Sequence, residues 1–346
     1  MKLKIDGVEY KGFSEYSVSL IFDSVASTFS FSALKDFAPK PFTYPLCEIE
    51  NDEGDLLITG VVLNNTFATT KKEQLVKVSG YSLPGALEDC QIPISIYPLQ
   101  SDKLTLKEIV DKVLAPFNLT YIADPVVSSD FNRIYTKSNA EPTETVKSYI
   151  NRLASQKGII LTHNERGQLV FTKIQAAELK AVVTFEDGNP GVFEMNLETQ
   201  GQQMHSEITV MRQASKKSPK ALQSTVYNPY VEVTRPKTKI LNTDSEDLLD
   251  VDKAARNELG AELASAINLT IKTTKFVKPG NLVQVKSPCN NINDFTDFFV
   301  QSTIINGDTR GEKYILNCVL KDVYTDDEVV NIFDDYDRFA NTLPKF

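Results

Sequence analysis

The feature that most constrains the fold of this chain is an alternation of apolar and polar residues with a period of two. It occurs in residues 16–20, YSVSL, and again in 28–32, TFSFS. Successive side chains of a β-strand point to opposite faces of the sheet, so the pattern predicts strands with one buried face. Residues 56–63 and 74–78 are apolar or alternating runs, and the polar stretch between them, NNTFATTKKE, is predicted to be a hairpin connection. We therefore expect residues 1–95 to form a β-domain.

The pattern then changes to helical spacing. Thr105 and Glu108 form a capping-box pair, and the apolar stripe after them predicts a helix that ends near Pro116. A second stripe predicts a helix over 144–156, and the segment that follows, IILTHNERGQLVFTK, predicts a short hairpin. We expect residues 96–175 to form a small mixed α/β domain between β-rich parts.

Strands and one long helix are predicted for the rest of the chain. The helix is expected over about 245–266, and strands follow it in INLTIKTTKF, NLVQVKS, DFFVQSTII and EKYILNCVLKDV. We expect residues 176–325 to form a second β-domain that includes this helix. The acidic tail, 326–346, places apolar anchors among acids, so we expect it to be a docking peptide outside any domain core.

Two ten-residue segments indicate an internal repeat. Residues 55–64 read DLLITGVVLN, and residues 297–306 read DFFVQSTIIN. Each follows a strand, LCEIE or LVQVK, and each precedes a polar turn and an alternating strand. Repeats at such a long separation are more typical of duplicated domains than of solenoids, whose period is about 20 to 50 residues. The two β-domains are therefore predicted to be similar, and chance likeness of two hairpins is the alternative.

Composition limits the possible functions. At 346 residues, with 41% hydrophobic and 24% charged residues, the chain is expected to fold into two to four domains. The formal charge of −9 argues against tight binding of a phosphate backbone. The lysines of one loop, Lys216, Lys217 and Lys220, are interpreted as part of a solvated connection. The amino terminus has no apolar run typical of a signal peptide, and no stretch predicts a membrane helix.

No catalytic, cofactor-binding or metal-binding residue is predicted. The chain has no HExxH, GxxxxGK or GxGxxG motif, and its two histidines, His163 and His205, are expected in surface or loop positions. The cysteines show no CxxC spacing and are expected to be buried free thiols rather than zinc ligands or disulfides. They are Cys47, Cys90, Cys289 and Cys318.

Carboxylates are the remaining enzymatic possibility, because a glycosidase needs only two of them. The acids of the tail are interpreted as solvated, since nothing there predicts a pocket that would raise a pKa. They are Asp326, Asp327, Glu328, Asp334, Asp335 and Asp337. A cell-wall hydrolase and a carbohydrate-binding β-protein stay as alternatives, and the absence of Trp argues against both.

Several segments resemble, in the same order, the baseplate hub proteins of phage Mu-type and P2 late-control-D-type contractile tails. The resemblance covers most of residues 1–325, although no single motif in it is a chemical signature. The segments are GYSLPGALEDCQIP at 80–93, TLKEIVDKVLAPFNL at 105–119, residues 144–173, SEITVMRQ at 206–213, VYNPYVEVTRPKTKI, DKAARNELGAELASAINLTI, and KPGNLVQV at 278–285.

This resemblance implies a mainly β, multidomain α+β fold. Two similar tail-tube-like β-barrel domains would flank the small α/β domain, and the helix would link them. The implied function is structural and not enzymatic, without cofactors: a homotrimeric ring joins the sixfold tail tube to the threefold spike and lines the DNA channel. Related proteins are the hub of larger myophages and the amino-terminal part of type VI secretion spike proteins.

The resemblance also implies partners and a location. The partners would be further copies of the chain, the tail tube protein, the central spike protein and baseplate wedge proteins, with DNA passing without specific binding and no insertion into a membrane. The protein would be made and assembled in the host cytoplasm and end in the virion, at the tail baseplate. Two parts depart from the family pattern, namely the loop after Gln213 and the acidic tail.

Overall fold

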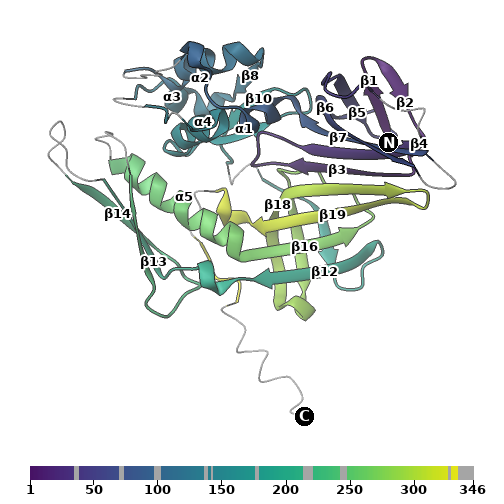
Figure 1. The fold of residues 1–346 in the computed structure, drawn as a ribbon. Helices are drawn as coiled ribbons and strands as arrows, with labels where there is room; N and C mark the ends of the chain where they lie inside the picture. The colour runs from purple at the N-terminus through teal and green to yellow at the C-terminus, as the bar shows by residue number, and fades with distance from the viewer. Residues whose placement is uncertain are drawn as a thin grey trace. The chain divides into compact units, whose positions relative to one another are not determined.

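The computed structural model of the protein describes residues 1–34, 39–69, 74–96, 103–135, 139–141, 143–175, 179–212, 221–241, 248–325 and 329–333. The chain divides into two compact units. Unit 1 contains Met1–Lys173 and Ser302–Tyr314, and unit 2 contains Ile174–Asn242, Glu246–Gln301 and the residues from Ile315 onward. The fold is mainly β with few helices, as the sequence predicts (Figure 1).

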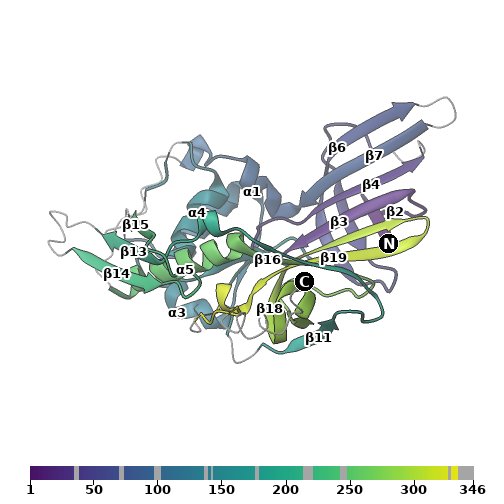
Figure 2. The ribbon, with the colours of Figure 1, turned by 90° about the horizontal axis from the view of Figure 1, so that it is seen from below.

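Unit 1 is built on an antiparallel sheet. Its strands lie in the order β18-β3-β4-β7-β6-β5-β1-β2, and Figure 2 shows β3, β4, β7 and β6 side by side. The strands are β1 (Lys2–Ile5), β2 (Val8–Tyr10), β3 (Glu15–Ile21), β4 (Thr28–Leu34), β5 (Leu46–Glu50), β6 (Leu56–Thr69), β7 (Gln74–Ser82) and part of β18 (Ile292–Asp308).

The period-two alternation decides which face of this sheet is buried. Val18, Phe29, Phe31 and Val78 point into one apolar core, while the serines between them lie on the opposite face. The predicted strands are confirmed. The predicted hairpin connection is wrong in its extent, because Asn64–Thr69 continue β6 and pair with β7. The strand β6 continues through this stretch because pairing satisfies the backbone N–H and C=O groups of both β6 and β7.

The sheet is completed by residues that are distant in sequence. Ser302 to Asp308 of β18 pair with Ile21 to Glu15 of β3. Across this seam the ring of Tyr16 lies on Gly307, and its hydroxyl donates to Glu312. A Cβ at position 307 would lie 2.0 Å from Cζ of Tyr16, so only glycine admits the ring. Tyr314 also donates to Glu312, at 2.8 Å.

The helices of unit 1 belong to a small α/β part with its own core. The predicted capping box at Thr105 and Glu108 is present, and Val110, Tyr149 and Phe171 are among the buried residues. The elements are α1 (Ala86–Asp89), α2 (Leu106–Leu114), β8 (Tyr121–Ala123), α3 (Ser128–Phe131), α4 (Val146–Ser155), β9 (Ile160–His163) and β10 (Leu169–Thr172). The predicted hairpin is β9–β10.

Unit 2 is a second β-rich body around a long helix, α5 (Leu248–Ala266). The helix contributes Val251, Ala255, Leu259 and Leu263 to the core, as its predicted apolar face requires. The strands are β11 (Ala181–Glu186), β12 (Val192–Thr199), β13 (Glu207–Arg212), β14 (Leu222–Tyr227), β15 (Pro236–Ile240), β16 (Ile267–Thr273), β17 (Leu282–Ser287) and parts of β18 and β19 (Gly311–Leu320). Strands β14, β13 and β15 form a separate small sheet beside α5 (Figure 2).

The two repeat segments occupy similar places in the topology. One lies in β6, between β5 and β7, and the other lies in β18, between β17 and β19. Their registers differ. In the first copy Leu46 pairs with Val61. In the second copy Leu282, the counterpart of Leu46, pairs with Phe299, although the counterpart of Val61 is Thr303. The likeness therefore concerns strand order and polarity rather than residue-by-residue pairing.

We predict that Gly307→Val destabilises unit 1, because its side chain would overlap the Tyr16 ring. Overpacking of this kind costs about 1–3 kcal/mol. Chemical denaturation should show a lower free energy of unfolding, whereas Gly201→Ala should be neutral because nothing lies within 4 Å of a Cβ there. Unchanged stability of Gly307→Val would mean that the ring does not depend on the glycine.

Candidate functional site

The most distinctive surface of unit 1 is the polar face of its sheet. Strand pairing brings Asn306, Ser17, Ser30, Ser79 and Asn64 side by side across five strands. We call these residues the serine row. The amide of Asn64 donates to the Ser79 hydroxyl at 3.5 Å. Every member of the row is small and uncharged.

A second row runs parallel to the serine row and carries charges of both signs. Register aligns Asp308, Glu15, Ser32 and Lys77, and Glu15 accepts a hydrogen bond from the Ser32 hydroxyl at 3.1 Å. Asp308, Glu15 and Lys77 are exposed. The alternating serines of the sequence indicated this polar face, but the joining of β18 to it was not predicted.

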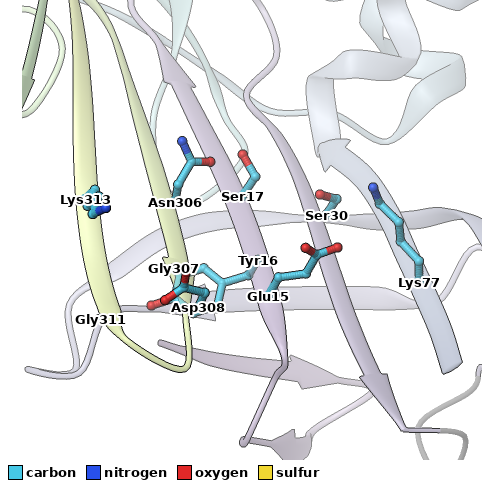
Figure 3. A pocket seen from close by; sticks show the side chains of 10 residues that line it. All are labelled: Glu15, Tyr16, Ser17, Ser30, Lys77, Asn306, Gly307, Asp308, Gly311 and Lys313. Carbon is cyan, nitrogen blue, oxygen red and sulfur yellow. The ribbon is translucent and has the colours of Figure 1, made fainter. Parts of the chain in front are cut away.

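The two rows border a hollow of about 350 Å³ that opens on this face. Figure 3 shows the side chains of Lys77 and Lys313 on opposite sides of it, with Glu15 and Asp308 between them. Hydroxyl, amide, carboxylate and ammonium groups are all present. Such a mixed surface offers hydrogen bonds to any polar molecule but no concentrated charge to hold one.

The beginning of the acidic tail lies against unit 2. The Tyr230 hydroxyl donates to the Val330 carbonyl at 2.9 Å and accepts from the Ile332 amide at 3.3 Å, and its ring meets Phe333 edge-on. We call this arrangement the Tyr230 clasp. Val329, Ile332 and Phe333 pack against the unit 2 core. The expectation that the tail has no core contact is therefore wrong for 329–333, because their apolar side chains find buried partners.

His163 is not the surface residue that the sequence predicts. It ends β9, and its ring contacts the Ser24 carbonyl at 2.7 Å through Nδ1 and the Ser27 hydroxyl at 2.8 Å through Nε2. A carbonyl only accepts, so Nδ1 carries the proton and Ser27 donates to Nε2. Burial lowers the pKa of His163. Ser27 is only 2% exposed, so this serine–histidine pair cannot reach a substrate.

His205 lies just before β13 and contacts an acid. Its Nδ1 is 2.7 Å from Glu262 Oε1, and Lys237 donates to the same oxygen at 2.9 Å. Glu262 also accepts from the His205 backbone amide at 3.1 Å. No hydroxyl or thiol of the described residues is hydrogen-bonded to Nε2 of His205, so the pair lacks the nucleophile of a catalytic triad.

Two of the cysteines are buried as predicted, and two are not. Cys47 and Cys318 are buried, whereas Cys90 is half-buried and Cys289 is exposed. The prediction is wrong for the latter pair because both lie outside the strands. Burial raises the pKa of Cys47 to about 12, which suppresses its thiolate. Among the described residues no group of three His, Cys, Asp or Glu side chains could hold a metal ion.

The remaining candidates from the sequence lie outside the described residues. They are Lys216, Lys217 and Lys220 of the basic loop and Asp326, Asp327, Glu328, Asp334, Asp335 and Asp337 of the tail. Within the described part of the chain no helix has the length and apolar character needed to cross a membrane.

Similarity to solved structures defines the class of fold. The 43 kDa tail protein of prophage MuSo2 from Shewanella oneidensis superimposes with a TM-score of 0.77 over 93% of this chain and 98% of that chain, at 21% identity. The E. coli c3393 protein, a component of the type VI secretion system, matches 92% of this chain and 77% of its own with a TM-score of 0.57 at 11% identity. The chain has the fold of phage tail proteins.

Comparison of sequences shows a narrower similarity than comparison of folds. Residues 85–173 match the model of a family described as the second domain of gp44-like baseplate hub proteins. The baseplate hub protein gp44 of Escherichia phage Mu is 24% identical over 216 residues, which is 60% of this chain and 54% of that protein. The resemblance to Mu-type baseplate hub proteins is thus confirmed. The match spans about half the length of the Mu relative.

We predict that His163 makes stability depend on pH. Because its pKa is lower in the folded than in the unfolded chain, the unfolded chain takes up the proton first as pH falls below the ordinary value of 6.5. The free energy of unfolding should fall between that value and the folded-state pKa. Denaturation of His163→Gln across this range should show a shallower slope than wild type, while His205→Gln keeps the His163 contribution. Equal slopes for wild type and His163→Gln would contradict this.

Proposed function

We propose that this protein is the structural baseplate hub of a contractile phage tail or a related injection machine. It forms a homotrimeric ring that joins the sixfold tail tube to the threefold spike. Its family and fold support this assignment. The observation that carries it is the sheet of unit 1, which has an apolar core on one face and carries the serine row and the neighbouring charged row on the other.

In this proposal the polar face lines the channel for DNA. The serine row presents only hydroxyls and amides, and its neighbour mixes Asp308 and Glu15 with Lys77. A wall that neutralised many phosphates would release counterions and hold DNA tightly. A wall with few lysines and compensating acids instead lets DNA pass, and the net charge of −9 favours the same outcome.

The division of the chain fits the symmetry of such a ring. We propose a first tube-like domain at 1–95, the α/β domain at 96–175, a second tube-like domain at 176–325 and the tail at 326–346. Two similar domains in each of three chains present six units to the tube. Cyclic closure needs contacts between unlike patches, and exposed strands at the sheet edges, such as β2 and β11, are suited to them.

The proposed role is not enzymatic. Ser27, the hydroxyl partner of His163, is buried. The His205–Glu262 pair has no nucleophile among the described residues. No catalytic, cofactor or metal residue is therefore assigned. The partners are further copies of the chain, the tail tube, the spike and the wedge proteins. The protein would be assembled in the host cytoplasm and reside in the virion baseplate.

We predict that the purified protein associates into a homotrimer. Light scattering at rising concentration should approach three times the chain mass of 38.6 kDa. A ring needs unlike patches to meet, so growth should stop at the closed species. Persistent monomer in assembled particles, or open-ended growth, would overturn the ring.

The serine row provides a test of the channel. Replacing Ser17 and Ser30 with Arg should slow DNA delivery strongly, because arginines there would bind passing phosphates. Gln223→Arg adds positive charge on an exposed position of β14 in unit 2 and should leave delivery unchanged. Delivery is measured with particles that contain equal amounts of each variant. Normal delivery by the double arginine variant would show that the row does not face DNA.

A further inference from the structure

A hollow of about 500 Å³ lies in unit 2 beside the Tyr230 clasp. Met204, Val231, Val233 and Ile267 contribute apolar surface to it. Asn331 and Phe333, from the start of the tail, form part of its wall. The tail is thus already a component of this hollow.

The clasp holds the tail in the manner of a bound peptide. The Tyr230 hydroxyl is hydrogen-bonded to the backbone of the tail at two points, and the side-chain amide of Asn331 donates to the Pro229 carbonyl at 3.4 Å. Phe333 packs its ring on Tyr230 with centroids 6.0 Å apart. Main-chain hydrogen bonds combined with apolar pockets are a general mode of recognising extended segments.

The described chain ends at Phe333, on the wall of the hollow, and the sequence continues as DDYDRFANTLPKF. From Phe333 to Phe339 an extended chain spans roughly 20 Å, enough to reach back across the hollow. Arg235 also lines the hollow, where its guanidinium is fixed by the carbonyls of Gly201 and Gln202, both at 2.9 Å. Its charge complements Asp334, Asp335 and Asp337, and Glu232, which also lines the hollow, complements Arg338.

We propose that the hollow binds the segment 334–346 of the same chain, with Phe339 as its apolar anchor. A short tether gives an effective concentration on the order of millimolar. A dissociation constant in the millimolar range is then enough for docking. Burial of the Phe339 side chain contributes part of this affinity. The charge of Arg235 and further apolar contacts contribute the rest. The inference does not depend on the ring proposed above.

The lack of Trp in the chain allows a direct test. In full-length Phe339→Trp the single indole should emit at shorter wavelength than free tryptophan and should resist quenching by acrylamide. Adding Val233→Asp should return emission and quenching to solvent-exposed values. Val233 is 65% exposed, so the substitution leaves the core intact. Val182→Asp is the matched control, because Val182 of β11 is also exposed, at 55%, and does not line the hollow.

Each other outcome overturns the proposal. An indole that is solvent-exposed in Phe339→Trp would show that the segment does not dock. An indole that stays protected after Val233→Asp would place it elsewhere. Protection that appears only as protein concentration rises would assign the hollow to the tail of a second copy instead. The homotrimer is measured separately by light scattering, so the two proposals fail independently.

Discussion

The contact between Tyr16 and Gly307 is the constraint on which much of unit 1 depends. It joins β3 to a hairpin that the chain reaches almost at its end, and Glu312 fixes the same hairpin by accepting from two tyrosine hydroxyls. Burial and the hydrogen bond to Glu312 raise the pKa of Tyr16, so the phenol stays protonated and remains a donor. Without this seam β3 would be an open edge and the polar face would lose Asn306 and Asp308.

The apolar core of unit 1 explains the chemistry of the polar face. Because the side chains of a strand alternate, burial of Val18, Phe29 and Phe31 forces Ser17 and Ser30 outward. The core therefore selects which residues meet the solvent.

Local patterns in the sequence predicted most of the elements but not how they meet. The capping box at Thr105 and the apolar face of α5 depend on neighbours a few residues away, so they could be read directly. Other contacts join residues far apart in sequence. They are the pairing of β18 with β3, the hydrogen bond between His163 and Ser24, and the Tyr230 clasp. Such contacts leave no periodic signal. The repeat at 55–64 and 297–306 was visible, but its difference in register was not.

The closing of unit 1 by residues 302–308 has a consequence for synthesis of the chain. β3 leaves the ribosome early, whereas its partner on β18 appears about 300 residues later. At the usual rate of about 5–20 residues per second, this edge stays open for roughly 15–60 s. During that time neighbouring nascent chains on one polysome could pair with it. The open edge is therefore exposed to mispairing until the last strands emerge.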